Sequence, residues 1–126
     1  MAILRRSVVA ILVALMLLTG LMSRPTGTAA HDSFGPLHRY LYYVVFPDEP
    51  GVAAWFDAII ECESAWDAGA WNPRPIYNGE HATGLLQFIP STFYGVSDGY
   101  IWSPYDQMWA ARTMWEQGRM YEWACA

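Results

Sequence analysis

Apolar residues recur at every third or fourth position between Val52 and Ile60, and this spacing predicts an amphipathic helix. Asp48 is expected to cap the helix, with Pro50 in its first turn, because acidic residues and proline are favoured there. The helix is predicted to end at residue 64 or 65. The stretch ECES, residues 61–64, therefore falls in its last turn.

A second helix is predicted to begin after Ser103 and to end near Gly118. Ser103 is placed as the N-cap, Pro104 follows at the first helical position, and Asp106 lies three residues after the cap. Glycine is the residue that most often follows the C-terminus of a helix. The spacing of these residues thus gives both limits of the helix.

The remaining segments are short. Residues 37–46 fit either a helix or a strand, because their periodicity does not decide between the two. Residues 67–80 contain the glycines and prolines of a loop, and residues 90–96 fit a helical turn. No segment shows a convincing strand alternation, so the chain is expected to be mainly α.

The two glutamates of ECES fall on different faces of the first helix at about 100° per residue. Glu63 continues the stripe of Phe56, Ile59 and Ile60, whereas Glu61 lies on the solvated face. A carboxyl group among apolar side chains loses solvation of its charged form, so its pKa rises, as a general acid requires near neutral pH. By helical phase alone, Glu63 is either a catalytic acid or a buried carboxyl held by a hydrogen bond.

The first thirty residues differ in composition from the rest. Arg5 and Arg6 precede an uncharged apolar stretch of about sixteen residues, and small residues follow up to Ala30. This order is typical of a signal peptide cleaved after Ala30, since a membrane-spanning helix needs about 20 residues. We expect residues 1–30 to be the signal peptide and residues 31–126 to be one exported domain, secreted or at the cell wall, without a stable membrane anchor.

The exported part is strongly acidic. Four arginines face twelve acidic residues and lysine is absent, which gives a net charge of −8. Nucleic acids and anionic membrane surfaces attract clustered positive charge, so neither is expected as a partner. The three histidines are scattered outside any ligand motif, and we expect no metal and no cofactor.

The chain contains two cysteines, Cys62 and Cys125. An even number of cysteines in an exported protein predicts a disulfide. A disulfide between these two residues would close a loop of about 64 residues, which stabilises a folded chain by about 4 kcal/mol in the chain-entropy model. The bridge would fix the last turn of the helix that carries Glu63.

Three segments resemble a known class of enzymes. They read IIECESAWDAGAWNP, ATGLLQFIPSTF and YDQMWAARTMWEQG followed by EWAC. In this order they are similar to the lytic transglycosylase (SLT-like) domains of the lysozyme superfamily and to the resuscitation-promoting factors, over about residues 37–126. The strongest matches are Glu-Ser with an aromatic and Ala-x-Asn-Pro, and Gly-Leu-x-Gln-Phe-x-Pro-Ser-Thr-aromatic. The resemblance implies a small lysozyme-like domain with a substrate cleft.

The resemblance also implies roles for single residues. Glu63 would protonate the glycosidic oxygen between N-acetylmuramic acid and N-acetylglucosamine in peptidoglycan glycan strands. Gln87 would contact sugar in the cleft, and Thr83 is placed to hydrogen-bond the catalytic carboxyl. The ending formed by Trp123 and Cys125 supports the disulfide. We expect the chain to act as a monomer.

One motif of the larger transglycosylases is missing, an Ala-Tyr-Asn whose tyrosine reaches the acid. The corresponding region reads AARTMWEQG, which leaves Tyr94 or Tyr105 as a substitute. Asp67 follows Glu63 by four residues but is expected to be a loop or capping acid. A single-glutamate reaction that forms 1,6-anhydro ends is therefore favoured. Hydrolysis is the runner-up, and a catalytically silent cell-wall binding module is the alternative.

The large side chains divide into two groups. Those at helical spacings are expected in the core: Trp55, Phe56, Trp109, Met114 and Trp115. Six aromatic residues lie in predicted loops, where their rings can stack on sugars: Trp66, Trp71, Tyr77, Tyr94, Tyr100 and Trp102. About half of these six are expected to line the cleft. Of these, Trp66, Tyr77 and Tyr94 are the predicted substrate contacts.

Overall fold

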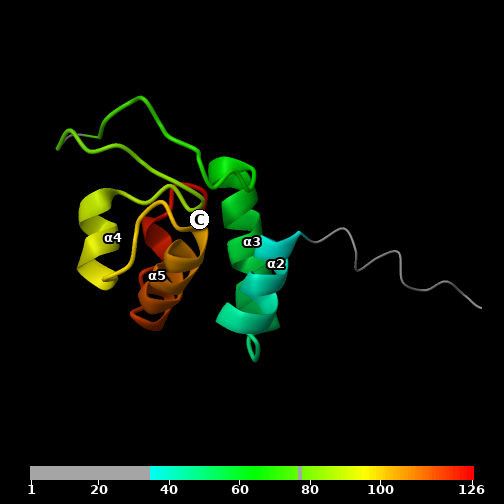
Figure 1. The fold of residues 1–126 in the computed structure, drawn as a ribbon. Helices are drawn as coiled ribbons and strands as arrows, with labels where there is room; N and C mark the ends of the chain where they lie inside the picture. The colour runs from blue at the N-terminus through cyan, green and yellow to red at the C-terminus, as the bar shows by residue number, and fades with distance from the viewer. Residues whose placement is uncertain (1–34, 77) are drawn as a thin grey trace, which may run out of the picture. The chain divides into compact units, whose positions relative to one another are not determined.

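The computed structural model describes residues 35–76 and 78–126, which belong to the unit Phe34–Ala126. In these residues the structure is mainly helical and contains isolated β-bridges but no strand (Figure 1). The elements are α2 (Pro36–Tyr40), the π-helix η1 (Leu41–Val45), α3 (Pro50–Ser64), α4 (Pro90–Val96), α5 (Pro104–Glu116) and the 3-10 helix η2 (Met120–Glu122). The predicted signal peptide, residues 1–30, lies outside the described residues.

The segment that fitted either a helix or a strand is helical. α2 runs directly into η1, in which the Phe46 N–H donates to the Leu41 carbonyl at 3.0 Å, the five-residue spacing of a π-helix. Leu41 and Val45 are buried and Phe46 follows them into the core. α4 begins at Pro90, as the sequence predicts. None of the helices in the described part of the chain has the length and apolarity to span a bilayer.

The long helix α3 ends at Ser64, as predicted, but its start differs by one residue. Glu49 rather than Asp48 occupies the N-cap position, and its side chain makes no capping hydrogen bond. The prediction of Asp48 as the cap is wrong because Pro50 takes the first helical position, which leaves the cap to the residue directly before it. At the other end, Ala65 and Trp66 are left-handed and turn the chain away from the helix axis.

Both limits of α5 follow the sequence signals. The Ser103 hydroxyl oxygen accepts the backbone N–H of Asp106 at 3.2 Å, and Pro104 is the first helical residue. Gly118 has a φ of 73°, and its N–H donates to the Trp115 carbonyl at 2.9 Å. The next N–H donates to the Met114 carbonyl at 2.9 Å. This pair of bonds is a Schellman motif, which satisfies the last carbonyls of the helix.

The buried core draws on η1, α3, α5 and the chain between α3 and α4. Phe56 and Met114 are fully buried, and Trp55 and Trp115 pack against them from the side. Trp109 is 41% exposed, so its expected place in the core is wrong. Its indole N–H donates to the Tyr40 hydroxyl at 3.0 Å, which holds the ring on the surface.

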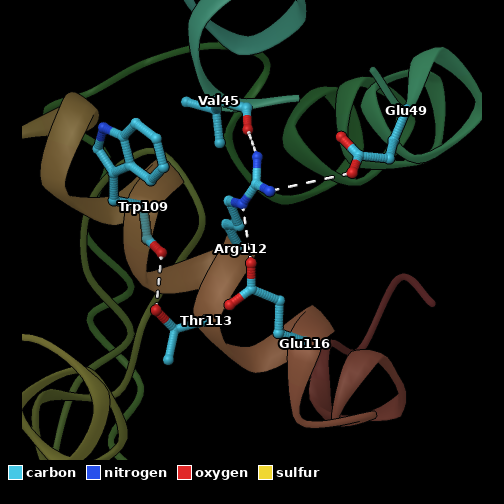
Figure 2. A network of polar contacts seen from close by, with 6 residues as sticks. All are labelled: Val45, Glu49, Trp109, Arg112, Thr113 and Glu116. Atoms are coloured by element: carbon cyan, nitrogen blue, oxygen red, sulfur yellow. Dashed lines mark hydrogen bonds and ion pairs between the residues drawn. The ribbon is translucent and has the colours of Figure 1, made fainter. Parts of the chain in front are cut away.

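Arg112 on α5 joins that helix to the beginning of α3 (Figure 2). Its guanidinium donates to the Val45 carbonyl, and to Glu116 at 2.9 Å, and lies 3.9 Å from Glu49. The guanidinium carbon is also 5.6 Å from the centre of the Phe46 ring. An arginine with its donors distributed over several fixed acceptors in this way stabilises the arrangement of the helices.

The predicted disulfide is present. Cys62, in the last turn of α3, is bonded to Cys125 with a Cα–Cα distance of 6.2 Å. The C-terminal end of the chain consequently lies beside α3 (Figure 1). Trp123, two residues earlier, is buried and packs edge-to-face on Phe56 at 5.4 Å between ring centres. The end of the chain is thus part of the core.

Candidate functional site

A cavity of about 350 Å³ lies where the end of α3, the chain before α4 and the C-terminal end meet. This volume is at the lower end of the range for ligand pockets, roughly 300–1,000 Å³. Its polar side chains are two carboxylates, two amides and one hydroxyl: Glu63, Glu122, Asn72, Gln87 and Thr92. Its apolar walls come from Ile76, Ala82, Phe88, Ile89, Met114, Trp123 and Ala124.

Glu63 reaches this cavity from the last turn of α3. The carboxyl group is half-buried, and its Oε1 accepts the backbone N–H of Cys125 at 3.2 Å. Burial raises the pKa of Glu63 above its ordinary value of 4.5, although hydrogen bonds from the backbone N–H groups of Cys125 and Ala124 oppose this rise. The site thus contains a carboxyl group whose protonated form is favoured by its surroundings.

The helical phase separates the two glutamates of ECES as predicted. Glu61 is exposed to solvent, whereas Glu63 lines the cavity. Ile59 and Ile60, which share the stripe with Glu63, are buried. The two glutamates are therefore not interchangeable, although they stand one residue apart.

Gln87, the second predicted site residue in the cavity, lies in the motif loop (residues 83–88). Its backbone is left-handed, with a φ of 50°. The side-chain Nε2 donates to the carbonyls of Gly84 at 2.9 Å and Ala70 at 3.2 Å. These two acceptors fix which end of the amide is nitrogen. Among the residues that the structure describes, no donor is bonded to Oε1, so this oxygen is available to a ligand.

Three side chains from other parts of the chain hold the motif loop. The Ser64 hydroxyl, next to Glu63, donates to the Leu85 carbonyl at 2.6 Å. The buried Gln107 on α5 accepts the Leu86 N–H at 2.7 Å, and the indole N–H of Trp123 donates to the Leu86 carbonyl at 3.0 Å. The loop therefore owes its position to α3, α5 and the C-terminal end at once.

Gln107 is the functional support that the sequence prediction missed. Its Nε2 also donates to the Thr83 and Ile101 carbonyls, at 2.8 Å and 2.6 Å, so both ends of the buried amide are satisfied. A Cβ at Gly84 would lie 2.2 Å from this nitrogen, and Gly84 has a φ of +79°. The sequence does contain a signal for Gln107, because this polar residue is the first in the buried stripe of α5. Glu63 stands in the same way at the end of the buried stripe of α3.

Glu122 is a second carboxylate on the cavity wall, and the sequence prediction did not include it. Arg119 donates to both of its oxygens, from Nε at 3.0 Å and from a terminal nitrogen at 2.8 Å. Such a two-point pair fixes the orientation of the carboxylate. The signal was weak, because a glutamate three residues after an arginine is a common surface pair.

Thr83 does not make the hydrogen bond expected of it. Its side chain is 5% exposed, and the hydroxyl donates to the His81 carbonyl at 2.9 Å. The backbone of Thr83 forms bridges with Trp71 and Phe88, which turn the residue inward. Thr83 is absent from the cavity lining, and the structure shows no hydrogen bond between it and the carboxyl group of Glu63.

The predicted sugar-stacking aromatics that the structure describes do not line this cavity. Trp66 stacks on His38 with 3.5 Å between ring centres, and Tyr94 is exposed on α4. Trp71, Tyr100 and Trp102 are also exposed and absent from the lining. Tyr77 lies outside the described residues. The aromatic residues that line the cavity are Phe88 and Trp123. Trp123 is held there by its own hydrogen bond to the motif loop and by the disulfide at Cys125.

The other carboxylates near the site have local partners. Asp67 accepts the Gly69 N–H at 2.8 Å and is exposed, as expected of a loop acid. Glu80 accepts both the N–H and the hydroxyl of Ser91 at 2.6 Å, and the hydroxyl lowers the pKa of Glu80. In residues 35–76 and 78–126, no group of three or more potential ligands is arranged to hold a metal ion.

No family model, curated protein or solved structure matches this chain. The kind of site is therefore inferred from the side chains that line the cavity. It combines a half-buried carboxyl group, a carboxylate paired with an arginine, amide and hydroxyl groups and an apolar wall in one cavity.

Proposed function

We propose that the protein is an exported enzyme that cleaves the glycosidic bond between N-acetylmuramic acid and N-acetylglucosamine in peptidoglycan. The observation that carries this proposal is Glu63, a carboxyl group with a raised pKa on the wall of a ligand-sized cavity. Burial of this kind is how enzymes keep a general acid protonated near neutral pH. The order of the ECES and GLLQFIPSTF segments supports the same class of enzyme.

The rest of the cavity suits a glycan. A sugar ring presents hydroxyl and acetamido groups at its edge and C–H groups on its faces. Gln87 offers a fixed amide oxygen, Asn72 and Thr92 add further polar groups, and Trp123 and Phe88 supply apolar walls. A mainly apolar pocket with a few placed polar groups is the usual form of a small-molecule site.

In the proposed reaction, Glu63 donates its proton to the glycosidic oxygen while the bond from that oxygen to C1 of N-acetylmuramic acid breaks. The N-acetylglucosamine end leaves with a free hydroxyl. The ionised Glu63 then accepts the proton of the 6-hydroxyl of the same muramic acid, whose oxygen bonds to C1. The product is a 1,6-anhydro sugar and no water is consumed. One carboxyl group serves as acid and then as base.

Hydrolysis is a second candidate, and Glu122 favours it. Glycosidases with two carboxylates use one as the acid and the other to activate water or to stabilise the charge that develops at C1. Glu122 lies on the same cavity as Glu63 and is paired with Arg119. A water molecule directed by Glu122 would give a reducing end instead of an anhydro end.

Mass spectrometry of digested peptidoglycan separates these reactions. We expect anhydro ends from the wild-type chain and a loss of about a thousandfold in their release for Glu63→Gln, the range that a general acid contributes. Glu61→Gln is the matched control, because Glu61 is exposed one residue away, and should change the rate less than about twofold. Equal loss in both variants would contradict the assignment of Glu63.

The same experiment tests the alternatives. Reducing ends, with a loss of about a hundredfold for Glu122→Gln, would establish hydrolysis with a second carboxylate. Binding to insoluble peptidoglycan without any soluble product would identify a binding module and overturn the enzyme proposal. The proposed setting is outside the cell, since the N-terminal thirty residues have the composition of an export signal.

A further inference from the structure

The last residues of the chain form one wall of the cavity. Residues 122–124 line it and Cys125 follows them, and we call residues 122–125 the C-terminal strap. The indole N–H of Trp123 is hydrogen-bonded to the motif loop, and the sulfur of Cys125 is bonded to Cys62. The first attachment holds the strap against the motif loop, and the second holds it against the end of α3.

The strap also contacts the carboxyl group of Glu63 through its backbone. The Cys125 N–H donates to Oε1 at 3.2 Å, and the nearby backbone N–H of Ala124 also lowers the pKa of this carboxyl group. Cys62, the disulfide partner, is the residue directly before Glu63. Cys125 is therefore attached to α3 twice, by its sulfur at one residue and by its N–H at the next.

We propose that Cys125 is a positioning residue for Glu63: the disulfide fixes the C-terminal strap so that its backbone N–H groups orient the carboxyl group in the cavity. Fixed donors restrict the carboxyl group to one orientation, which is the requirement for efficient proton transfer. The consequence for turnover rests on the proposed function. The effect on the carboxyl group itself does not.

Few charges face Glu63, so a change in its titration reports on the strap. Glu122 is the other titratable side chain lining the cavity in the described residues, and it is paired with Arg119. Glu61, on the same helix, faces solvent. The cavity residues from the motif loop, α4 and α5 are uncharged. Glu61 is therefore the internal reference, because Glu122 belongs to the strap itself.

Ala124→Pro tests the proposal while it leaves both cysteines in place. Proline removes the Ala124 N–H. Trp123 already has φ −81° and ψ 137°, the extended conformation that a residue before proline adopts. Donors to a carboxylate lower its pKa, so Glu63 should titrate at a higher pH in this variant, as measured by carboxyl-carbon NMR. Ala124→Val, which adds bulk and keeps the N–H, should titrate like wild type.

The double variant Cys62→Ser with Cys125→Ser releases the strap altogether. It should shift the Glu63 titration in the same direction, and peptidoglycan cleavage should fall by about tenfold to a hundredfold in kcat with little change in KM. Near-UV circular dichroism checks that each variant is folded. If the double variant unfolds, Ala124→Pro alone decides.

The proposal is overturned if Glu63 titrates as in wild type when Ala124→Pro is folded. It is also overturned if Glu61 shifts as much as Glu63, because the effect would then be general. A shift specific to Glu63 supports positioning even if peptidoglycan is not cleaved. That last result would remove the proposed function and leave the role of the strap intact.

Discussion

The two ends of α3 are both joined to distant parts of the chain, but their polar groups are used differently. At the start of the helix, the guanidinium of Arg112 is shared among Val45, Glu49 and Glu116 and lies over aromatic rings (Figure 2). At the other end, Glu63 accepts only backbone hydrogen bonds and faces a cavity. One end uses its charge to hold the fold, and the other keeps a carboxyl group accessible.

This difference separates structural from chemical roles better than burial does. Arg112 and Glu63 are both partly buried. The donors of Arg112 are occupied by groups of the protein, so little is left for a ligand. Burial raises the pKa of Glu63, and its carboxyl group lines a cavity. Partly satisfied polar groups at an accessible cavity are the ones to test for function.

The largest effect on the free energy of unfolding is expected at Gln107, whose side chain holds the motif loop in place. Gln107→Leu would leave the Leu86 N–H and the Ile101 carbonyl without their partner, whereas the Thr83 carbonyl would keep the N–H of Phe88. A lost partner costs about 1–3 kcal/mol for each buried group, so we expect the free energy of unfolding to fall by about 4 kcal/mol in urea titrations.

Gln117→Leu is the matched control, because Gln117 is exposed at the end of the same helix. It should change the free energy of unfolding by less than about 0.5 kcal/mol. A similar small change in Gln107→Leu would show that the motif loop does not depend on the buried amide.

Arg112→Met tests the structural end of the comparison. It keeps much of the apolar stem but removes the bonds to Val45 and Glu116 and the pairing with Glu49. We expect a loss of about 2 kcal/mol in unfolding free energy, with the Glu63 titration unchanged because the cavity is not touched.

Arg39→Met removes an exposed arginine from α2 and serves as the reference. Its unfolding free energy should stay within about 0.5 kcal/mol of wild type. If Arg112→Met shifted the titration of Glu63 instead of the stability, the two ends of α3 would not be independent.

The features that the sequence predicted correctly depend on neighbouring residues. The Ser103 cap and the Gly118 ending of α5 are local, and so is the helical phase that separates Glu61 from Glu63. The disulfide followed from the number of cysteines rather than from their positions. Such features need no knowledge of how distant segments meet.

The features that the sequence missed depend on contacts between distant segments. Gln107 and Glu122 matter because the motif loop and the end of the chain come to them. Thr83 faces inward because its backbone forms bridges with Trp71 and Phe88. No local pattern in the sequence predicts these two pairings. Trp109 was assigned to the core by spacing, yet its hydrogen bond to Tyr40 keeps it outside.

The smallest effect is expected from the pH dependence of stability at Glu63. Because its pKa is raised in the folded state, the folded chain holds this proton at a pH at which the unfolded chain has lost it. The stability that this bound proton gives to the folded chain is fully present below about pH 4.5, and it is lost as the pH rises through the folded-state pKa of Glu63. Glu63→Gln should therefore gain stability relative to wild type as the pH rises above about 4.5, by less than about 1 kcal/mol because solvent screens a half-exposed group. Urea titrations from about pH 4 upward, with Glu61→Gln as the comparison, would contradict the assignment if both variants gave the same dependence on pH.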